Sequence, residues 1–391
     1  MEDVYIAGAH VTPFGKFEDK SLRTLATEAV DGVLADVGCG PDEIDMVFFG
    51  NAAEGLLTGQ ESIRGQVVLQ ATGLDGKPLV NCENACASGS TAAHMAIMAV
   101  RTGTADVALA LGAEKLTNPD RGKTFSVFKS GWDVEEYGGP DATSNQSAFM
   151  NVYADMARDY MARSGATIED FAAVSVKSHD NGALNPNAQY REPLTVDEVL
   201  ASRLIADPLR TLMCSPIGDG ASAVVVTNAR GLARLDADPI RVVAAALCGA
   251  RDETETAVVR AARIAYEKAG VRPDDVDVVE IHDAAAPAEL IVPEELGFVA
   301  AGEGPELFRA GETALGGQFP INPSGGLLSR GHPIGATGCA QLTELVDQLR
   351  GRCGARQVPG AKIALAENGG GWLGGKGPAV ATITILAGNG T

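Results

Sequence analysis

The stretch NCENACASGSTAAHMAIMAV, residues 81–100, places Cys86 among small residues where an apolar helical pattern begins. A helix N-terminus presents free backbone N–H groups and a partial positive charge. That field would favour a thiolate, and the same N–H groups could hold a developing oxyanion. Cysteine also packs as a small apolar residue, so Cys86 taken alone is either a nucleophile or a core residue.

Two of the five histidines lie where chemistry is expected. His282 ends an apolar strand in VVEIHDAAAP, and the strand ends of α/β sheets face the usual active-site crevice; a structural histidine is the alternative. His332 lies in the glycine-rich loop NPSGGLLSRGHPIGATG, whose glycines indicate close approach to the backbone. A thiol beside imidazoles is the equipment of nucleophilic acyl transfer.

The elements that would carry these residues form an internal sequence repeat. GCGPDEIDMVFFGNAAEG begins at Gly38 and GVRPDDVDVVEIHDAAAP at Gly270, each after a helical pattern and each followed later by a small-residue turn into a helix. Helices alternating with aliphatic strands indicate α/β units on a largely parallel sheet. If two such halves pack about a pseudo-twofold axis, the helix starts at Cys86 and near Gly338 face each other across one cleft.

This repeat predicts two related domains, residues 1–235 and 236–391. The first half carries an insertion at about 117–205, rich in Asn, Gly, Asp and aromatic residues. Insertions of this length in compact domains are often binding regions.

The composition narrows the class of protein. The net charge of −20, from 31 basic and 51 acidic residues, repels nucleic acid and anionic membranes. No apolar run is long enough to span a membrane, the acidic N-terminus does not resemble a signal peptide, and no Cys/His cluster has the spacing of zinc ligands. Seven cysteines, an odd number, favour reduced thiols. We expect a cytoplasmic protein with no metal, nucleic-acid or membrane partner.

With these residues in view, the chain resembles a thiolase, and most closely the sterol-carrier-protein type and its bacterial and archaeal relatives. The resemblance covers nearly the whole sequence. It rests on CAS at Cys86, HD at His282, NPSGG at 322–326 and GHPIGATG at 331–338. It implies an α/β thiolase-like fold, with two pseudo-twofold-related halves in a five-layer αβαβα arrangement.

The resemblance also implies roles for individual residues. Cys86 matches the nucleophile that takes an acyl group from a coenzyme A thioester. His332 matches the histidine that activates this thiol and helps to bind the thioester oxygen. His282 stands where other thiolases have an asparagine that holds a water for the same oxyanion hole. The backbone N–H groups of Cys86 and Gly369 match a second hole.

The chain departs from the family at the acid/base position. Other thiolases carry a second cysteine, in Cys-x-Gly or after the His-Asp pair, that moves the proton of the carbon nucleophile. Here Glu367 and Ala284 occupy those positions, and Cys339 lies within a helix. Three explanations remain open: Glu367 transfers the proton with a pKa raised by burial, His282 or a substrate group does so, or condensation is lost. Glu367 could also be only a strand-end carboxylate that caps backbone N–H groups.

Coenzyme A carries phosphates, so an acidic chain needs basic residues at the entrance to its active site. The candidates are Arg121, Lys123 and Lys129 in the insertion and Arg330 beside the glycine-rich loop, with solvated surface charge as the alternative for each. No permanently bound cofactor is expected, since the coenzyme A thioester is the substrate.

The function expected from the resemblance is an acyl-CoA-dependent C-acyltransferase that makes or cleaves a carbon–carbon bond of a 3-oxoacyl-CoA or a related substrate. Its alternative is a carbon–carbon lyase (a retro-aldolase) or a non-condensing subunit of a multi-protein acyl-CoA complex. The resemblance further implies a homodimer or homotetramer. It also implies a possible partner with a zinc ribbon and an OB-fold that presents the acyl-CoA.

Overall fold

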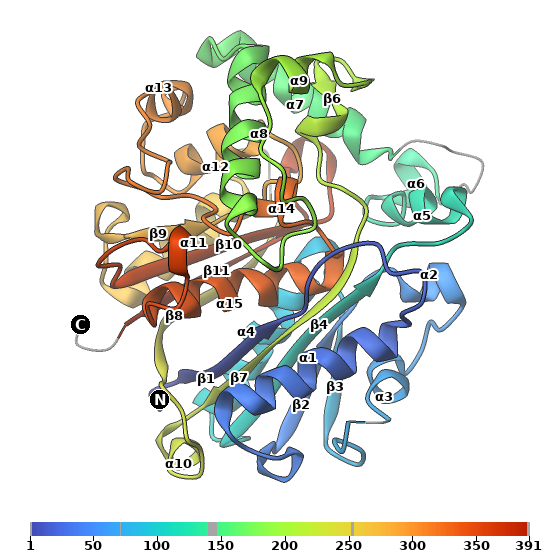
Figure 1. Cartoon of the computed structure of the whole chain (residues 1–391), viewed down its shortest axis with the longest axis vertical. Coiled ribbons are helices and arrows are strands. Elements are labelled where there is room, and N and C mark those ends of the chain that lie inside the picture. The colour runs from blue at the N-terminus through green and yellow to red at the C-terminus, as the bar shows by residue number, and fades with distance from the viewer. Residues whose placement is uncertain (1, 71, 140–146, 252–253, 389–391) are drawn as a thin grey trace.

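The computed structural model describes residues 2–70, 72–139, 147–251 and 254–388 (Figure 1). Nine strands form one hydrogen-bonded sheet in the order β3-β2-β4-β7-β1-β8-β11-β10-β9. Its strands are β1 (Tyr5–Val11), β2 (Met46–Gly50), β3 (Leu79–Cys82), β4 (Val107–Lys115), β7 (Asp219–Thr227), β8 (Ile240–Gly249), β9 (Val278–Glu280), β10 (Ile363–Gly370) and β11 (Val380–Ala387). The two halves of this sheet meet where β1 pairs with β8 over only two residue pairs.

The two halves of the sheet repeat one topology. β2 pairs parallel with β4 and β4 antiparallel with β7, just as β9 pairs parallel with β10 and β10 antiparallel with β11. Even β3, parallel to β2, has a counterpart in the parallel bridge between Ile321 and Val279. The expected division near residue 235 falls between α10 (Ala229–Leu232) and β8, and we keep it as our proposal for the domain boundary.

The expectation of a largely parallel sheet is wrong, because five of its eight strand pairs are antiparallel. The connection from β10 to β11, residues 371–379, illustrates the reason. It is shorter than the dozen or more residues that a parallel crossover needs, so consecutive strands joined in this way run antiparallel.

Helices lie on both faces of each half of the sheet, which confirms the five-layer arrangement (Figure 1). The outer layers are formed by α1 (Leu22–Val37) and α11 (Ala257–Ala269). Each of these helices begins at a capping hydroxyl, Ser21 or Thr256, and ends at a left-handed glycine, Gly38 or Gly270. These are ordinary start and stop signals of helices, and they explain why the repeat was visible in the sequence.

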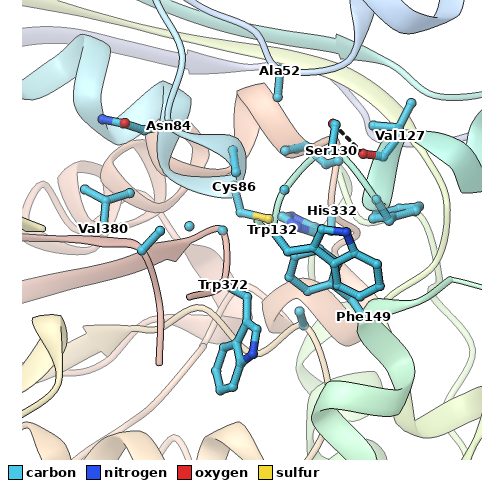
Figure 2. Close-up of a pocket in the computed structure, with 18 of the residues that line it drawn as sticks. Ala52, Asn84, Cys86, Val127, Ser130, Trp132, Phe149, His332, Trp372 and Val380 are labelled. Atoms are coloured by element: carbon cyan, nitrogen blue, oxygen red, sulfur yellow. Dashed lines mark hydrogen bonds between the residues drawn. The ribbon is translucent and has the colours of Figure 1, made fainter. Parts of the chain in front are cut away.

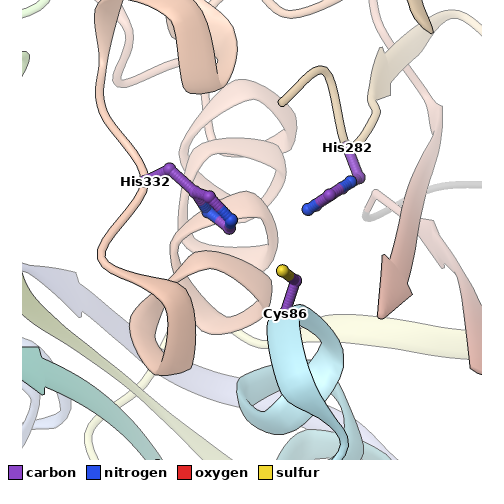
Figure 3. Close-up of side chains that lie close together, drawn as sticks. All are labelled: Cys86, His282 and His332. Atoms are coloured by element: carbon purple, nitrogen blue, oxygen red, sulfur yellow. The ribbon is translucent and has the colours of Figure 1, made fainter. Parts of the chain in front are cut away.

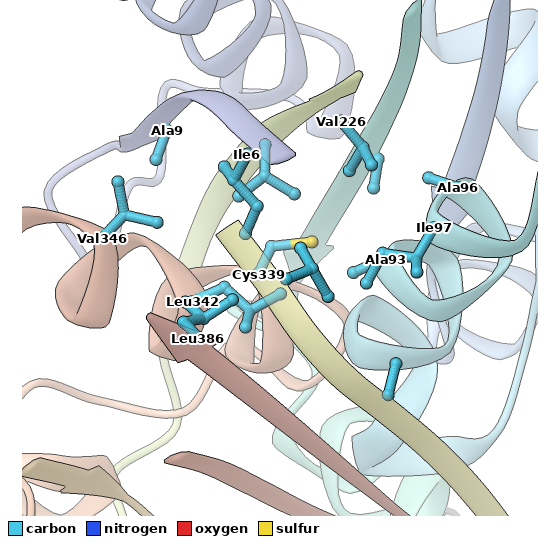
Figure 4. Close-up of a cluster of buried hydrophobic side chains, with 14 of the residues drawn as sticks. Ile6, Ala9, Ala93, Ala96, Ile97, Val226, Cys339, Leu342, Val346 and Leu386 are labelled. Atoms are coloured by element: carbon cyan, nitrogen blue, oxygen red, sulfur yellow. The ribbon is translucent and has the colours of Figure 1, made fainter. Parts of the chain in front are cut away.

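The central layer consists of α4 (Ser88–Arg101) and α15 (Thr337–Leu349), which share one apolar core with strands of both halves (Figure 4). The two helix starts touch: a Cβ built on Gly89 would lie 2.4 Å from the Gly335 carbonyl oxygen, and one on Gly338 would lie 2.3 Å from the Ser90 nitrogen. The expected apposition of the two helix starts is therefore present. Cys339 is buried in this core, with its Sγ 3.4 Å from the Gly89 carbonyl oxygen.

The insertion between β4 and β7 is mainly helical and covers the opposite end of the molecule from α10 (Figure 1). Of the expected range 117–205, residues 140–146 lie outside the described part of the chain. Asn181 and Asn185 donate to the carbonyl oxygens of Asn322 and Ser324, so the insertion packs on a loop of the second half. Its elements are α5 (Arg121–Phe128), α6 (Val134–Tyr137), α7 (Phe149–Ser164), α8 (Ile168–Ala183), α9 (Val196–Ala201), β5 (Leu204–Ala206) and β6 (Leu209–Arg210).

The remaining helices are short. They are α2 (Glu54–Thr58), α3 (Arg64–Val68), α12 (Ala288–Glu295), α13 (Gly304–Arg309) and α14 (Gly326–Ser329). None of the described helices is both long and apolar enough to cross a membrane. All seven cysteines are free thiols.

Candidate active site

Cys86 lies in a tight turn, η2 (Ala85–Ala87), that leads directly into α4. Ala85 has a positive φ of 48°, a conformation that is costly for a residue with a side chain and is often found at functional sites. The Ser88 hydroxyl holds the turn, because it accepts from the Asn84 N–H and donates to the Ala85 carbonyl oxygen. The turn thereby exposes the Cys86 thiol to the cleft between the two halves.

The Cys86 thiol is protonated at neutral pH, which corrects the expectation of a helix-stabilised thiolate. Burial, together with a smaller effect of the nearby Glu114 carboxyl, raises its pKa to about 12. The backbone N–H groups of Cys86 and Gly371 lower it but do not outweigh burial. Activation of the thiol therefore requires a base.

His332 is suited to be that base. Its Nδ1 lies 2.7 Å from the Thr337 hydroxyl oxygen, and that hydroxyl donates to the Pro333 carbonyl oxygen. Because the Thr337 proton is used there, Nδ1 must be the protonated nitrogen, which leaves a lone pair on Nε2. Burial lowers the pKa of His332 well below its usual value, so the ring is neutral and can accept a proton.

His282 follows β9 and completes a group of three side chains (Figure 3). A ring nitrogen of each histidine and the Cys86 Sγ lie within 4.8 Å of one another, and the two rings meet edge to face at 5.1 Å. Burial lowers the pKa of His282 to about 4, and its buried Nε2 has no hydrogen-bond partner among the described residues. This nitrogen is free for a ligand oxygen, and the three atoms together could also hold a soft metal ion such as Zn²⁺.

Glu367 lies on β10, facing the same space as His282. Its carboxylate accepts from the His282 backbone N–H at 2.9 Å, so part of its role is to hold that segment. The side chain is only 1% exposed, and burial raises its pKa to about 8. A carboxyl with this pKa can exchange protons near neutral pH.

A second backbone donor that faces the Cys86 sulfur belongs to Gly371. The expected role of the Gly369 N–H in an oxyanion hole stays a prediction. β10 ends at Gly370, and Gly371 has a φ of 65°, so the chain turns there toward the start of α4. Gly369 is still within the strand and lines the neighbouring cavity.

The expectation that Arg330 contacts coenzyme A is wrong. Arg330 is 1% exposed, and its guanidinium donates to Glu280 at 2.9 Å and to the Ser324 hydroxyl. The ion pair is structural, since it joins the segment before His282 to the segment before His332. The arginine next to the glycine-rich loop looked accessible in the sequence because its partner lies 50 residues away.

Two cavities lined by described residues meet at Cys86. The first, of about 290 Å³, also contains His332 and has walls that include Trp132, Phe149 and Trp372 (Figure 2). Trp132 stacks on Phe149 at 6.1 Å. The second, of about 230 Å³, contains His282 and Glu367. The thiol is therefore reachable by an apolar ligand from the insertion side.

A third cavity, of about 220 Å³, extends from His332 to a group of cations, Lys16, Arg121 and Arg203. Arg121 was among the residues expected to contact coenzyme A, whereas Lys16 and Arg203 were not. The walls of the three cavities, as formed by described residues, contain neither Lys123 nor Lys129. Lys123 is exposed on α5, and Lys129 caps the end of that helix. Their role at the mouth of the site stays a prediction.

Two carboxyl groups near the site, one buried and one half-buried, were missed from the sequence. Glu114, at the end of β4, accepts from the Ala53 and Gly335 backbone N–H groups and so ties the two halves together beside Cys86. Glu295, on α12, accepts from the Thr256 hydroxyl and lines the second cavity. An acidic residue at the end of an apolar run, as in DVALALGAE, was the available signal for Glu114; Glu295 had none.

Comparisons with known proteins show the family of this chain. The sequence pattern described as "Thiolase, N-terminal domain" matches residues 4–230, and "Thiolase C-terminal domain-like" matches residues 242–382. The chain is 41% identical over 379 residues to the acetyl-CoA acetyltransferase of Methanothermobacter thermautotrophicus, covering 95% of this chain and 97% of that protein.

Two further proteins are similar along most of the chain. Sterol carrier protein 2 of Bos taurus is 35% identical over 387 residues, covering 93% of this chain and 69% of that protein. A solved structure titled "Ltp2-ChsH2(DUF35) aldolase" has a TM-score of 0.81 at 27% identity and covers 100% of this chain and 98% of that chain. The chain belongs to the thiolase family and is an acyltransferase.

Proposed function

We propose that the protein is an acyl-CoA-dependent C-acyltransferase that carries the acyl group on Cys86. The observation that supports this most directly is the group of three atoms, the Cys86 sulfur and one nitrogen each of His282 and His332, within 4.8 Å at the junction of two cavities. A neutral thiol beside a neutral imidazole with a free lone pair is equipped for nucleophilic attack on a thioester.

In the first half-reaction, the Cys86 thiol loses its proton to Nε2 of His332 as the sulfur attacks the thioester carbonyl carbon. The carbonyl oxygen becomes an oxyanion. The backbone N–H groups of Cys86 and Gly371 are placed to stabilise it, and so is His282 when its neutral ring carries the proton on Nε2. The bond to the coenzyme A sulfur then breaks, and His332 returns its proton to that sulfur. Loss of one such oxyanion donor typically reduces the rate by about 10²–10³.

In the second half-reaction, the Glu367 carboxylate takes a proton from the α-carbon of a second acyl-CoA. The resulting carbanion attacks the thioester on Cys86, a carbon–carbon bond forms and the bond to sulfur breaks. The proton held by Glu367 then returns to the Cys86 sulfur. The raised pKa of Glu367, about 8, supports this assignment over a carboxylate that only caps backbone groups.

The coenzyme A moiety would lie in the third cavity. Its thioester end would be at His332, and its phosphates would be near Lys16, Arg121 and Arg203. Because the surface is otherwise acidic, basic side chains that line a cavity are needed to bind phosphate groups.

A second candidate function is carbon–carbon bond cleavage by a retro-aldol reaction. It is favoured by the similarity to a structure titled as an aldolase and by the absence of the family's second cysteine. Retention of Cys86 beside two histidines favours acyl transfer, because a retro-aldol cleavage needs no thioester on the protein.

We further propose that the protein is cytoplasmic, forms a homodimer or homotetramer and works with a DUF35-type partner. The aldolase structure carries such a partner in its title. β3 is a short edge strand whose Val80 is 38% exposed, and an open strand edge is a common place for a second chain to bind. Size-exclusion chromatography with light scattering would show the number of copies.

The test is mass spectrometry of the intact protein and its peptides after mixing with acetyl-CoA and with phenylacetyl-CoA. We expect one acyl group on the peptide that contains Cys86, none in Cys86→Ala, and an unchanged adduct in Cys39→Ala, a matched cysteine outside the described cavities. An adduct on another cysteine, or no adduct with either thioester, would contradict the proposed acyl-enzyme.

A further inference from the structure

We propose that the acyl group carried on Cys86 is uncharged and about the size of a ring, and that acetyl and dicarboxylic acyl groups are poor donors. This inference rests on the proposed function, and it is carried by the shape, lining and charge of the second cavity.

We assign the acyl group to the second of the two cavities that contain Cys86, the one that also holds Glu367. It contains Cys86 together with His282 and Glu367, so an acyl chain attached to the sulfur extends into it while coenzyme A occupies the cation-lined cavity. Its volume is about 230 Å³. An apolar cavity of about 150 Å³ accepts benzene, so this one has room for a ring and several further atoms, whereas an acetyl group would leave most of it empty.

The walls of the second cavity are apolar faces of helices from different parts of the chain. α7 contributes Phe149, Val152, Tyr153 and Met156, which follow the helical spacing of one face. α12 contributes a second face. Its members in the wall are Ala288, Ile291 and Val292. Filling this space with apolar atoms stabilises the bound acyl group, because apolar surface is removed from water.

The charged groups in this cavity exclude an anionic acyl group. The described residues that line it include two carboxyl groups, Glu295 and Glu367, but no lysine or arginine. A second carboxylate on the acyl group, as in a succinyl group, would be buried without a cation beside two acids, which is strongly unfavourable. Glu295, held by the Thr256 hydroxyl at 2.7 Å, instead offers an acceptor to a hydroxyl or amide of the ligand.

The experiment compares acylation rates of Cys86 with acetyl-CoA, benzoyl-CoA, phenylacetyl-CoA and succinyl-CoA, measured by intact mass over time. We expect phenylacetyl-CoA to acylate the protein about tenfold faster than acetyl-CoA does. We expect succinyl-CoA to be the slowest of these three donors. Acetyl-CoA or succinyl-CoA at the rate of phenylacetyl-CoA would overturn the inference and leave the acyl-enzyme standing. No adduct with any thioester would overturn the proposed function and this inference with it.

A variant shows whether the second cavity causes the preference. Met156→Trp fills the space between the helices, so we expect it to slow phenylacetyl transfer about tenfold more than it slows acetyl transfer. The matched control is Met98→Trp, at a methionine that is 42% exposed on α4, which should change neither rate. Equal slowing of both thioesters by Met156→Trp in a folded protein would place the acyl group elsewhere. The comparison of thioesters on the unaltered protein decides the inference if this variant does not fold.

Discussion

Cys86 and His332 are both uncharged in the resting site, and this follows from their burial. An ion pair of thiolate and imidazolium would lose part of its hydration at this site, and that loss exceeds the attraction unless further hydrogen bonds compensate. The proton therefore moves from Cys86 to His332 only when a thioester is bound and the sulfur attacks its carbonyl carbon. The site protects its thiol from other electrophiles in the same way.

The protonated state of Cys86 predicts slow alkylation. Its pKa of about 12 lies above that of a free cysteine, about 8.5, so the thiolate fraction at neutral pH is smaller. We expect iodoacetamide to modify Cys86 far more slowly than N-acetylcysteine at pH 7, with a rate that keeps rising through pH 10. Peptide mapping at a series of pH values measures this. A rate that levels off near pH 7 would show that the thiolate is already stabilised.

Replacement of Glu367 separates the two half-reactions. Glu367→Gln keeps the size of the side chain and an acceptor for the His282 N–H but removes the base, so we expect normal acylation of Cys86 and condensation reduced about 10²–10⁴-fold. In the unaltered protein, condensation should rise with pH up to about 8, because only the carboxylate can accept the α-proton. Formation of the 3-oxoacyl-CoA product, measured separately from the coenzyme A that acylation releases, reports this step. Normal condensation by Glu367→Gln would assign the proton to another group.

At the scale of elements, the two helix starts can deliver their residues to one site only because glycines let their backbones touch. Gly89 in α4 and Gly338 in α15 lie against the partner turn, and Glu114 accepts from Gly335 beside them. The same contact places the turn of Cys86 against the loop of His332. Packing between elements, and not the helix signals themselves, therefore sets the distance between nucleophile and base.

This contact predicts that Gly338→Ala destabilises the protein. Alanine gains about 1 kcal/mol of helix propensity, but its Cβ would lie 2.3 Å from the Ser90 backbone nitrogen, so the helices must move apart. We expect a net decrease of about 1–3 kcal/mol in the free energy of unfolding, measured with urea. Gly316→Ala is the control, because a Cβ there meets no atom within 4 Å. An unaltered midpoint for Gly338→Ala would show that the helix starts do not constrain each other.

At the scale of the whole molecule, a net charge of −20 repels an anionic substrate, and local cations must overcome this. Lys16, Arg121 and Arg203 come from the start of the chain and from both ends of the insertion, yet they line one cavity that ends at His332. The insertion thus completes a site whose reacting groups belong to the two halves.

This arrangement predicts that loss of one of these cations weakens the binding of acyl-CoA and leaves the rate of the chemical steps unchanged. Arg203→Ala and Arg121→Ala should each raise KM for an acyl-CoA about threefold and leave kcat unchanged, and the effect should weaken in high salt. Acyl-N-acetylcysteamine, which lacks the phosphates, should be unaffected. Lys123→Ala serves as the comparison, since Lys123 lies on the same helix but outside the cavity wall. A larger effect of Lys123→Ala would restore the assignment made from the sequence.

The sequence by itself determined the repeat, the thiolase-like fold and the segments that carry Cys86, His282, His332 and Glu367. These features are encoded locally, in caps, left-handed glycines, apolar runs and short motifs, so they can be predicted without knowledge of distant contacts. The direction of the strands in the sheet was the exception. Whether two strands run parallel or antiparallel depends on the path of the chain that connects them.

Only the tertiary structure decided the protonation of Cys86, the burial of Arg330, the donor at Gly371 and the cavities. Each of these depends on atoms brought together from distant parts of the chain. Desolvation sets the pKa of the thiol, the partner Glu280 removes Arg330 from the surface, and three separate segments supply the cations. Local sequence names the groups that can react, while burial and pairing decide which charge each group carries and what it can reach.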